Sequence, residues 1–118
     1  MSELATILPV PVLIVEDEVI IAMDIGMQLR DLGYEPLGPA VTGAQAIELA
    51  GQLRPQLVLM DIHLGNQMDG ITAAQKIRMQ FEIPCLFLSA FSAEEDQARA
   101  QLTNPAGYLA KPDRKSVV

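Results

Sequence analysis

Short apolar runs recur five times along the chain, and stretches with helical periodicity lie between them. The apolar runs cover residues 10–15, 34–40, 56–61, 85–88 and 107–110. Between these runs, apolar residues return at intervals of three and four, which is typical of amphipathic helices. The expected helices cover residues 18–32, 43–54, 70–80 and, in a more polar form, 93–102. Strands that alternate with helices predict a parallel sheet with helices on both faces. Right-handed crossovers favour a doubly wound α/β sheet of order 2-1-3-4-5, the flavodoxin-like order.

The helical spacing also predicts which side chains face the sheet. The first three helices should turn these residues inward: Ile21, Ile25, Leu29 and Leu32; Ala46, Ile47, Leu49, Ala50 and Leu53; Ile71, Ala74 and Ile77. We expect Thr42 and Asp69 to cap the second and third helices, and Asp17 to cap the first. Pro36, Gly38 and Pro39 indicate that the second strand lies at an edge of the sheet.

Composition narrows the class of protein. The chain has 118 residues, half of them hydrophobic, which suits one folded domain. A net charge of −7 argues against nucleic acid or an anionic membrane as the partner of this domain. The apolar runs are too short to cross a bilayer. Cys85 is the only cysteine and lies in an apolar run, so we expect a buried hydrophobe, no intramolecular disulfide and a cytoplasmic location.

Polar residues with complementary chemistry follow the strand ends. The first strand runs into Glu16 and Asp17, the third ends at Asp61, the fourth at Ser89 and the fifth at Lys111. The carboxyl ends of parallel strands meet at one edge of a sheet, so these residues should surround one crevice. Carboxylates about 5 Å apart repel by roughly 3 kcal/mol per pair at an effective dielectric near 20, so raised pKa values or a cation must compensate.

An all-oxygen ligand set favours Mg²⁺ over Zn²⁺. The backbone carbonyl of His63 is a further candidate ligand. A carboxylate beside a divalent ion, with an amine and a hydroxyl on the same rim, suits phosphoryl transfer. Asp61 would attack phosphorus, Mg²⁺ and Lys111 would neutralise the phosphoryl oxygens, and Ser89 would hydrogen-bond the product.

The strand-end motifs resemble the receiver domain of two-component response regulators. They occur in the family's order and with similar spacing over residues 10–112: Leu13-Ile14-Val15-Glu16-Asp17-Glu18, Leu57-Val58-Leu59-Met60-Asp61-Ile62, Met68-Asp69-Gly70, Leu88-Ser89-Ala90 and Gly107-Tyr108-Leu109-Ala110-Lys111-Pro112. The resemblance implies that Asp61 is the phosphoacceptor, that Asp17 binds Mg²⁺ directly and that Glu16 acts through water.

The same resemblance implies the remaining roles and the partners. Lys111 would contact the phosphoryl group, Ser89 and Tyr108 would be the switch residues, and the bond to Pro112 is expected to be cis. A histidine kinase or a histidine phosphotransfer protein would supply the phosphoryl group. The domain would be a signalling phosphoacceptor, not an enzyme.

The expected end of the chain departs from the family pattern. We expect residues 1–9 to be a lead-in and residues 10–118 a receiver domain that lacks most of the last helix. Ile20, Met23 and Met27 form a second apolar stripe on the first helix. Three explanations stay open for it: cover by the last helix, docking of a kinase, and docking of a second copy in a homodimer.

Two other functions compete with phosphorylation. Cobalamin-binding domains share the fold class and carry Asp-x-His-x-x-Gly after the same strand. Here residues 61–66 read Asp-Ile-His-Leu-Gly-Asn, with Asn66 where glycine is required, and Glu16, Asp17 and Lys111 would have no role. The second alternative is a receiver-like scaffold that binds a partner without being phosphorylated.

Overall fold

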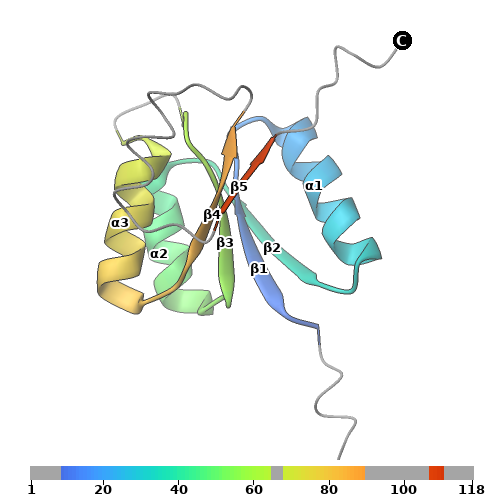
Figure 1. Cartoon of the computed structure of the whole chain (residues 1–118), viewed down its shortest axis with the longest axis horizontal. Coiled ribbons are helices and arrows are strands. Elements are labelled where there is room, and N and C mark those ends of the chain that lie inside the picture. The colour runs from blue at the N-terminus through green and yellow to red at the C-terminus, as the bar shows by residue number, and fades with distance from the viewer. Residues whose placement is uncertain (1–8, 65–67, 90–106, 111–118) are drawn as a thin grey trace, which may run out of the picture.

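The computed structural model describes residues 9–64, 68–89 and 107–110, and these form a parallel sheet with helices on both faces (Figure 1). The strands are β1 (Pro11–Val15), β2 (Glu35–Ala40), β3 (Leu57–Asp61), β4 (Cys85–Ser89) and β5 (Gly107–Ala110). The helices are α1 (Val19–Asp31), α2 (Gly43–Leu53) and α3 (Gly70–Phe81). The strand order is β2-β1-β3-β4-β5, which confirms the predicted order. The helix expected over 93–102 lies outside the described residues.

The sheet separates two hydrophobic layers. Figure 1 shows α2 and α3 on one face of the sheet and α1 on the other. Successive side chains of a strand point to opposite faces, so Leu13 and Val15 pack on the α2 and α3 side, whereas Val12 and Ile14 pack on the α1 side. This two-sided burial explains why the central strands read as unbroken apolar runs.

Two predicted helix caps are confirmed. The Thr42 hydroxyl accepts a hydrogen bond from the Gln45 backbone N–H at 3.0 Å, at the start of α2. An oxygen of Asp69 accepts from the Thr72 N–H at 2.9 Å, at the start of α3. Each bond satisfies one of the N–H groups that have no partner within the first turn of a helix.

Two of the side chains predicted to face inward are exposed instead. Leu32 is 73% exposed and Leu53 is 44% exposed. Leu32 is the residue after the last turn of α1, and Leu53 is the last residue of α2. The sheet does not cover these ends of the two helices. The two predictions were therefore wrong. The other predicted inward residues are buried or partly buried.

The edge position predicted for the second strand is confirmed. Among the described strands β2 pairs only with β1, and the pairing shifts register between Leu13 and Val15. Gly38 stands in this irregular stretch with a φ of +94°, and a Cβ there would lie 2.9 Å from the backbone nitrogen of Ala40. Glycine is therefore the residue that this bend accepts.

Cys85 is a buried hydrophobe, as predicted. Its side chain is 4% exposed, and burial raises the pKa of the thiol to about 12, against a smaller lowering by Arg78. A thiol with so high a pKa does not react as a thiolate near neutral pH. None of the described helices has the length and apolar character needed to span a bilayer.

Candidate functional site

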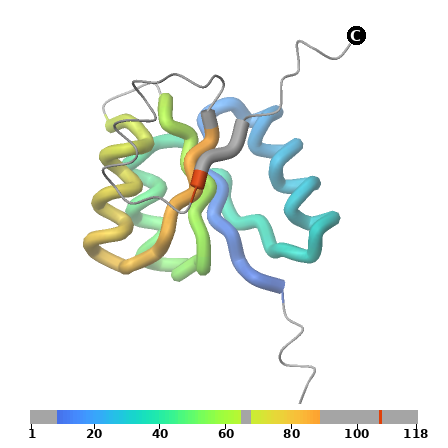
Figure 2. The backbone as a smooth tube through the Cα atoms, viewed as in Figure 1, coloured from blue at the N-terminus to red at the C-terminus, as the bar shows by residue number. Residues whose placement is uncertain are grey.

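The strand register brings the predicted acidic residues to one edge of the sheet. Val15 of β1 pairs with Met60 of β3, so Glu16 and Asp61 occupy the next position on two neighbouring strands. Neighbouring strands lie about 4.8 Å apart. Figure 2 shows that the chain turns from β1 into α1, and from β3 toward α3, at this same end of the sheet. The two carboxylates therefore start from adjacent backbone positions.

Asp61 is buried and its carboxylate is held by the loop that follows. The residue is 1% exposed, and its Oδ1 accepts the backbone N–H of His63 at 3.0 Å. The N–H of Ile62 donates to the carbonyl of Leu88 at 3.2 Å, which continues the β3–β4 ladder past the end of the strand. A carboxylate with one oxygen fixed in this way has a defined plane, which suits a group that must react in one direction.

Glu16 is also buried, and it contributes to the start of α1. It is 0% exposed, and its Oε2 accepts the backbone N–H of Glu18 at 3.1 Å. Glu18 occupies the N-cap position and makes no capping bond with its own side chain. The prediction that Asp17 caps α1 was therefore wrong, because the helix begins two residues after it. Asp17 is instead exposed in the turn.

The turn after β1 gathers three carboxylates. Oxygen atoms of Glu16, Asp17 and Glu18 all lie within 4.8 Å of one another. At that separation each pair of charges repels by about 1 kcal/mol in water and about 3 kcal/mol at an effective dielectric of 20. A divalent cation would relieve this repulsion, and three hard oxygen donors fit Mg²⁺ or Ca²⁺ better than a softer metal.

This group differs from the predicted ligand set in two respects. Glu18 belongs to it but was not selected from the sequence, although the run of three acids was the available signal. Asp61 is not one of the three. Coordination by Asp61 and by the His63 carbonyl stays a prediction. The His63 side chain is exposed, as expected.

Gly70 belongs to the Met68-Asp69-Gly70 motif, but the sequence analysis gave it no role in the site. It is the first residue of α3, and its N–H donates to the Ile62 carbonyl at 2.8 Å. A Cβ at this position would overlap the carbonyl oxygen of Asp61 and would lie 2.8 Å from its carbonyl carbon. The start of α3 thus rests directly on the backbone of Asp61. The available signal was a glycine directly after a helix-capping aspartate.

Four of the residues named in the sequence analysis have side chains outside the described part of the structure. The backbones of Ser89 and Tyr108 belong to β4 and β5, where Phe87 pairs with Tyr108 and Ser89 pairs with Ala110. Their side chains, and the whole of Lys111 and Pro112, lie outside the described part of the structure. The roles predicted for them stay predictions.

A family model described as the response regulator receiver domain matches residues 12–118. The chain is 42% identical over 104 residues to the transcriptional regulatory protein PdtaR of Mycobacterium tuberculosis, an alignment that covers 88% of this chain and 50% of that protein. The chain thus spans about half the length of this relative. It is 37% identical over 115 residues to the chemotaxis protein CheY of Treponema pallidum, covering 93% of this chain and 78% of CheY.

The backbone of the chain is also similar to that of a solved receiver domain. The signal receiver domain of a modulated diguanylate cyclase from Desulfovibrio desulfuricans G20 superposes with a TM-score of 0.82 at 38% identity. That superposition covers 88% of this chain and 82% of the other. Sequence and backbone comparisons therefore agree on one family.

Proposed function

Because the chain belongs to the response regulator receiver domain family, we propose that Asp61 accepts a phosphoryl group from a phosphohistidine of a partner protein. The family serves two-component signalling as phosphoacceptor domains and is generally not enzymatic. The observation that carries the proposal is the buried Asp61 carboxylate at the end of β3, one strand away from buried Glu16. The family match leaves the cobalamin-binding alternative without support.

The chemistry is a transfer between two nucleophiles. A carboxylate oxygen of Asp61 attacks phosphorus on the side opposite the donor nitrogen. The new O–P bond forms as the N–P bond breaks, and the electron pair of the N–P bond goes to the imidazole of the donor. The bond from the His63 N–H to Oδ1 fixes the plane of the carboxylate that attacks.

The acidic residues would hold the metal ion that this transfer needs. Glu16 and Asp17, with Asp61 and the His63 carbonyl, would bind Mg²⁺, Glu16 acting through water. When bound, the ion neutralises negative charge on the phosphoryl oxygens. We assign Lys111 the same task from the end of β5.

Phosphorylation would act as a switch. The acyl phosphate adds negative charge beside the end of β4, where the Ser89 hydroxyl would donate a hydrogen bond to a phosphoryl oxygen. Movement of Ser89 would let Tyr108 repack, which shifts an existing equilibrium between two conformations. A partner reads the resulting surface around β5. We place the domain in the cytoplasm, with a histidine kinase or a histidine phosphotransfer protein as the donor.

Phosphorylation with a small donor tests the proposal. Acetyl phosphate and Mg²⁺ should label the wild-type chain, as measured by intact-protein mass and by a phosphate-affinity gel. Asp61→Asn should abolish labelling, because the nucleophile is gone. Asp31→Asn is the matched control, since Asp31 is an exposed aspartate at the far end of α1.

The outcomes separate the candidate functions. Labelling that persists in Asp61→Asn means that another residue is the acceptor. A wild-type chain that is never labelled, with or without Mg²⁺, favours the scaffold alternative. Loss of labelling when Mg²⁺ is chelated supports the assigned role of the acidic residues.

A further inference from the structure

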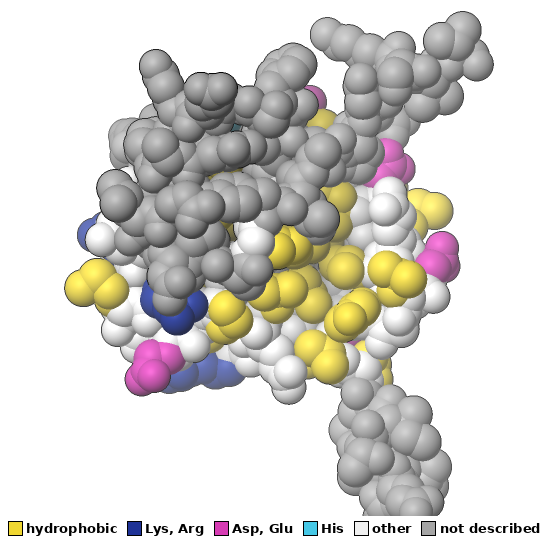
Figure 3. Space-filling view, in the orientation of Figure 1, with side chains coloured by type: hydrophobic (Ala, Val, Ile, Leu, Met, Phe, Trp, Pro, Cys, Tyr) yellow, Lys and Arg dark blue, Asp and Glu magenta, His cyan; other side chains and the backbone are white. Residues whose placement is uncertain are grey.

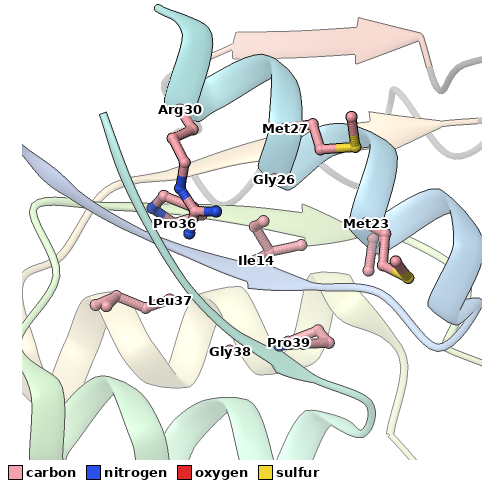
Figure 4. Close-up of a pocket in the computed structure, with 10 residues that line it drawn as sticks. Ile14, Met23, Gly26, Met27, Arg30, Pro36, Leu37, Gly38 and Pro39 are labelled. Carbon is pink, nitrogen blue, oxygen red and sulfur yellow. The ribbon is translucent and has the colours of Figure 1, made fainter. Parts of the chain in front are cut away.

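The apolar stripe expected on α1 is exposed. Ile20, Met23 and Met27 are 58%, 61% and 61% exposed. The two methionines line a cavity of about 250 Å³ between α1 and β2 (Figure 4). Figure 3 shows hydrophobic side chains gathered in a band on this side of the molecule. The described residues do not show what covers the stripe, so its docking role stays a prediction.

Met68, on the other face of the sheet, packs against the start of α2. It is partly buried and contacts the hydrophobic cluster beneath α2 and α3. Its side chain lies over Gly43, the first residue of α2. A Cβ added at Gly43 would lie 3.0 Å from the Met68 Sδ and 3.1 Å from its Cβ and Cγ. Glycine thus leaves the space in which Met68 is seated, and an unbranched thioether can follow the shape of that space.

Met68 anchors the returning end of the loop that follows Asp61. The outgoing end of this loop is anchored by Ile62 and Leu64, which are 0% and 2% exposed. Met68 comes two residues before Gly70, whose N–H donates to the Ile62 carbonyl at 2.8 Å and whose backbone lies against Asp61. A shift of Met68 would therefore reach Asp61 through a very short piece of backbone.

The start of α2, on which Met68 rests, is itself fixed by two hydrogen bonds. The Gln45 N–H donates to the Thr42 hydroxyl at 3.0 Å, and the Gln45 side-chain oxygen accepts the Val41 N–H at 2.8 Å. Reciprocal bonds of this kind hold the first turn of a helix to the chain that enters it. Met68 is thus seated on a support that does not move with the loop.

The same segment also holds the second buried carboxylate of the site. The N–H of Glu16 donates at 2.9 Å to the carbonyl of Ala40, the last residue of β2. Ala40 lies three positions before Gly43. Glu16 and Asp61 therefore rest on one short segment of chain, Glu16 through a backbone bond and Asp61 through Met68.

We propose that Met68 is a positioning residue for Asp61: seated on Gly43, it holds the acceptor carboxylate in place relative to Glu16. This role rests on the proposed phosphorylation of Asp61. A reacting group must stay within about 0.5 Å of its productive position. Misplacement by about 1 Å lowers the rate about a hundredfold. Met68 acts through the backbone of the loop and the start of α3, not by contact with the phosphoryl group.

Met68→Ala removes the seated side chain and tests the proposal. Per folded molecule, labelling by acetyl phosphate and Mg²⁺ should slow at least about tenfold, because the loop is no longer held against α2. Amide hydrogen exchange gives a second readout, without phosphate. The His63 N–H, which donates to Asp61 Oδ1, should exchange faster in the variant. This increase should exceed that of the Val58 N–H, at the opposite end of β3.

Three control variants separate positioning from loss of stability. Leu49→Ala truncates another partly buried side chain that packs against the same cluster, on α2. It should lower the free energy of unfolding but leave the labelling rate per folded molecule unchanged. Met68→Leu keeps the volume of the side chain and should retain wild-type labelling. Met79→Ala replaces a methionine that is 75% exposed on α3, and it should change neither quantity.

Gly43→Ala tests the same contact from the other side, and it decides the proposal if Met68→Ala does not fold. The new Cβ presses against Met68, so labelling should slow in this variant as well. In the double variant the two effects should not multiply, because the truncated side chain no longer meets the added methyl group. Effects that multiply would mean that the two residues act independently, which overturns the proposal.

The outcomes distinguish this inference from the phosphorylation itself. A wild-type chain that is never labelled overturns both. A labelled wild type whose Met68→Ala form is labelled equally fast per folded molecule overturns the role of Met68 alone. An increase in His63 exchange that is no larger than the increase at Val58, or no larger than in Leu49→Ala, also overturns that role.

Discussion

Replacing Gly70 by alanine should damage both the stability of the domain and the reactivity of Asp61. Gly70 begins α3, and its backbone lies against the carbonyl of Asp61. A methyl group there would overlap the carbonyl oxygen of Asp61 and lie 3.0 Å from Ile62 Cα. All of these atoms belong to the backbone, so no side chain can rotate to make room. The start of α3 and the end of β3 must move apart.

The structure sets the size of the effect. Forcing an extra carbon into a packed site costs about 1–3 kcal/mol. Separation also weakens the bond from the Gly70 N–H to the Ile62 carbonyl, which is 2.8 Å long, and such a bond contributes about 1 kcal/mol. Alanine has a better helix propensity than glycine, which offsets the loss by less than about 1 kcal/mol. We expect a net loss of about 2–3 kcal/mol in the free energy of unfolding.

The backbone shift should also slow phosphorylation. A displacement of the reacting group by about 1 Å lowers the rate of a well-oriented reaction by about a hundredfold. The Gly70→Ala chain that remains folded should therefore take up phosphate from acetyl phosphate much more slowly than the wild type. Normalising the rate to the folded fraction separates this effect from loss of stability.

Urea denaturation and the labelling rate are the two assays. Gly26→Ala is the matched control, because among the described residues a Cβ at 26 meets nothing closer than 3.7 Å. It should stabilise the domain by about 0.5–1 kcal/mol and leave labelling unchanged. If Gly70→Ala behaves like Gly26→Ala in both assays, the contact between α3 and Asp61 does not have the role assigned to it.

Three further predictions concern other parts of the chain. Thr42→Ala should lower the free energy of unfolding by about 1 kcal/mol in urea denaturation, because the bond to the Gln45 N–H is lost, whereas Thr42→Ser should retain it. Above pH 9.0 the unfolded chain releases the Cys85 proton, whereas the folded chain keeps it until about pH 12. The free energy of unfolding should therefore fall by about 1.4 kcal/mol per pH unit between these two pH values. Cys85→Ala should lack this part of the slope; an unchanged slope would contradict the burial of the thiol. Relief of carboxylate repulsion predicts that millimolar Mg²⁺ raises the melting temperature of the wild type, and that Asp17→Asn reduces this rise.

The order of elements could be predicted from the sequence because it depends on local patterns. Apolar runs of strand length and helical spacing give the alternation of strands and helices, and chirality then restricts how a sheet can connect them. The caps at Thr42 and Asp69 were also predictable, since a capping bond spans only three residues. Burial of Cys85 followed from its place in an apolar run.

Helix ends were less predictable because they depend on what lies opposite them. Leu32 and Leu53 continue the apolar spacing of their helices but extend past the cover of the sheet. At the start of α1, the Glu16 carboxylate accepts the Glu18 N–H and takes the place of the expected cap. Helical periodicity carries no information on where a neighbouring layer stops.

The sequence by itself determined which chemical groups stand at the strand ends, because a strand and the acid that ends it are neighbours along the chain. Only the tertiary structure decided how those groups meet. Strand register sets Glu16 beside Asp61, and the close approach of α3 makes Gly70 part of the support of Asp61. Packing between distant segments produces these contacts, and no short stretch of sequence encodes the distance between two elements.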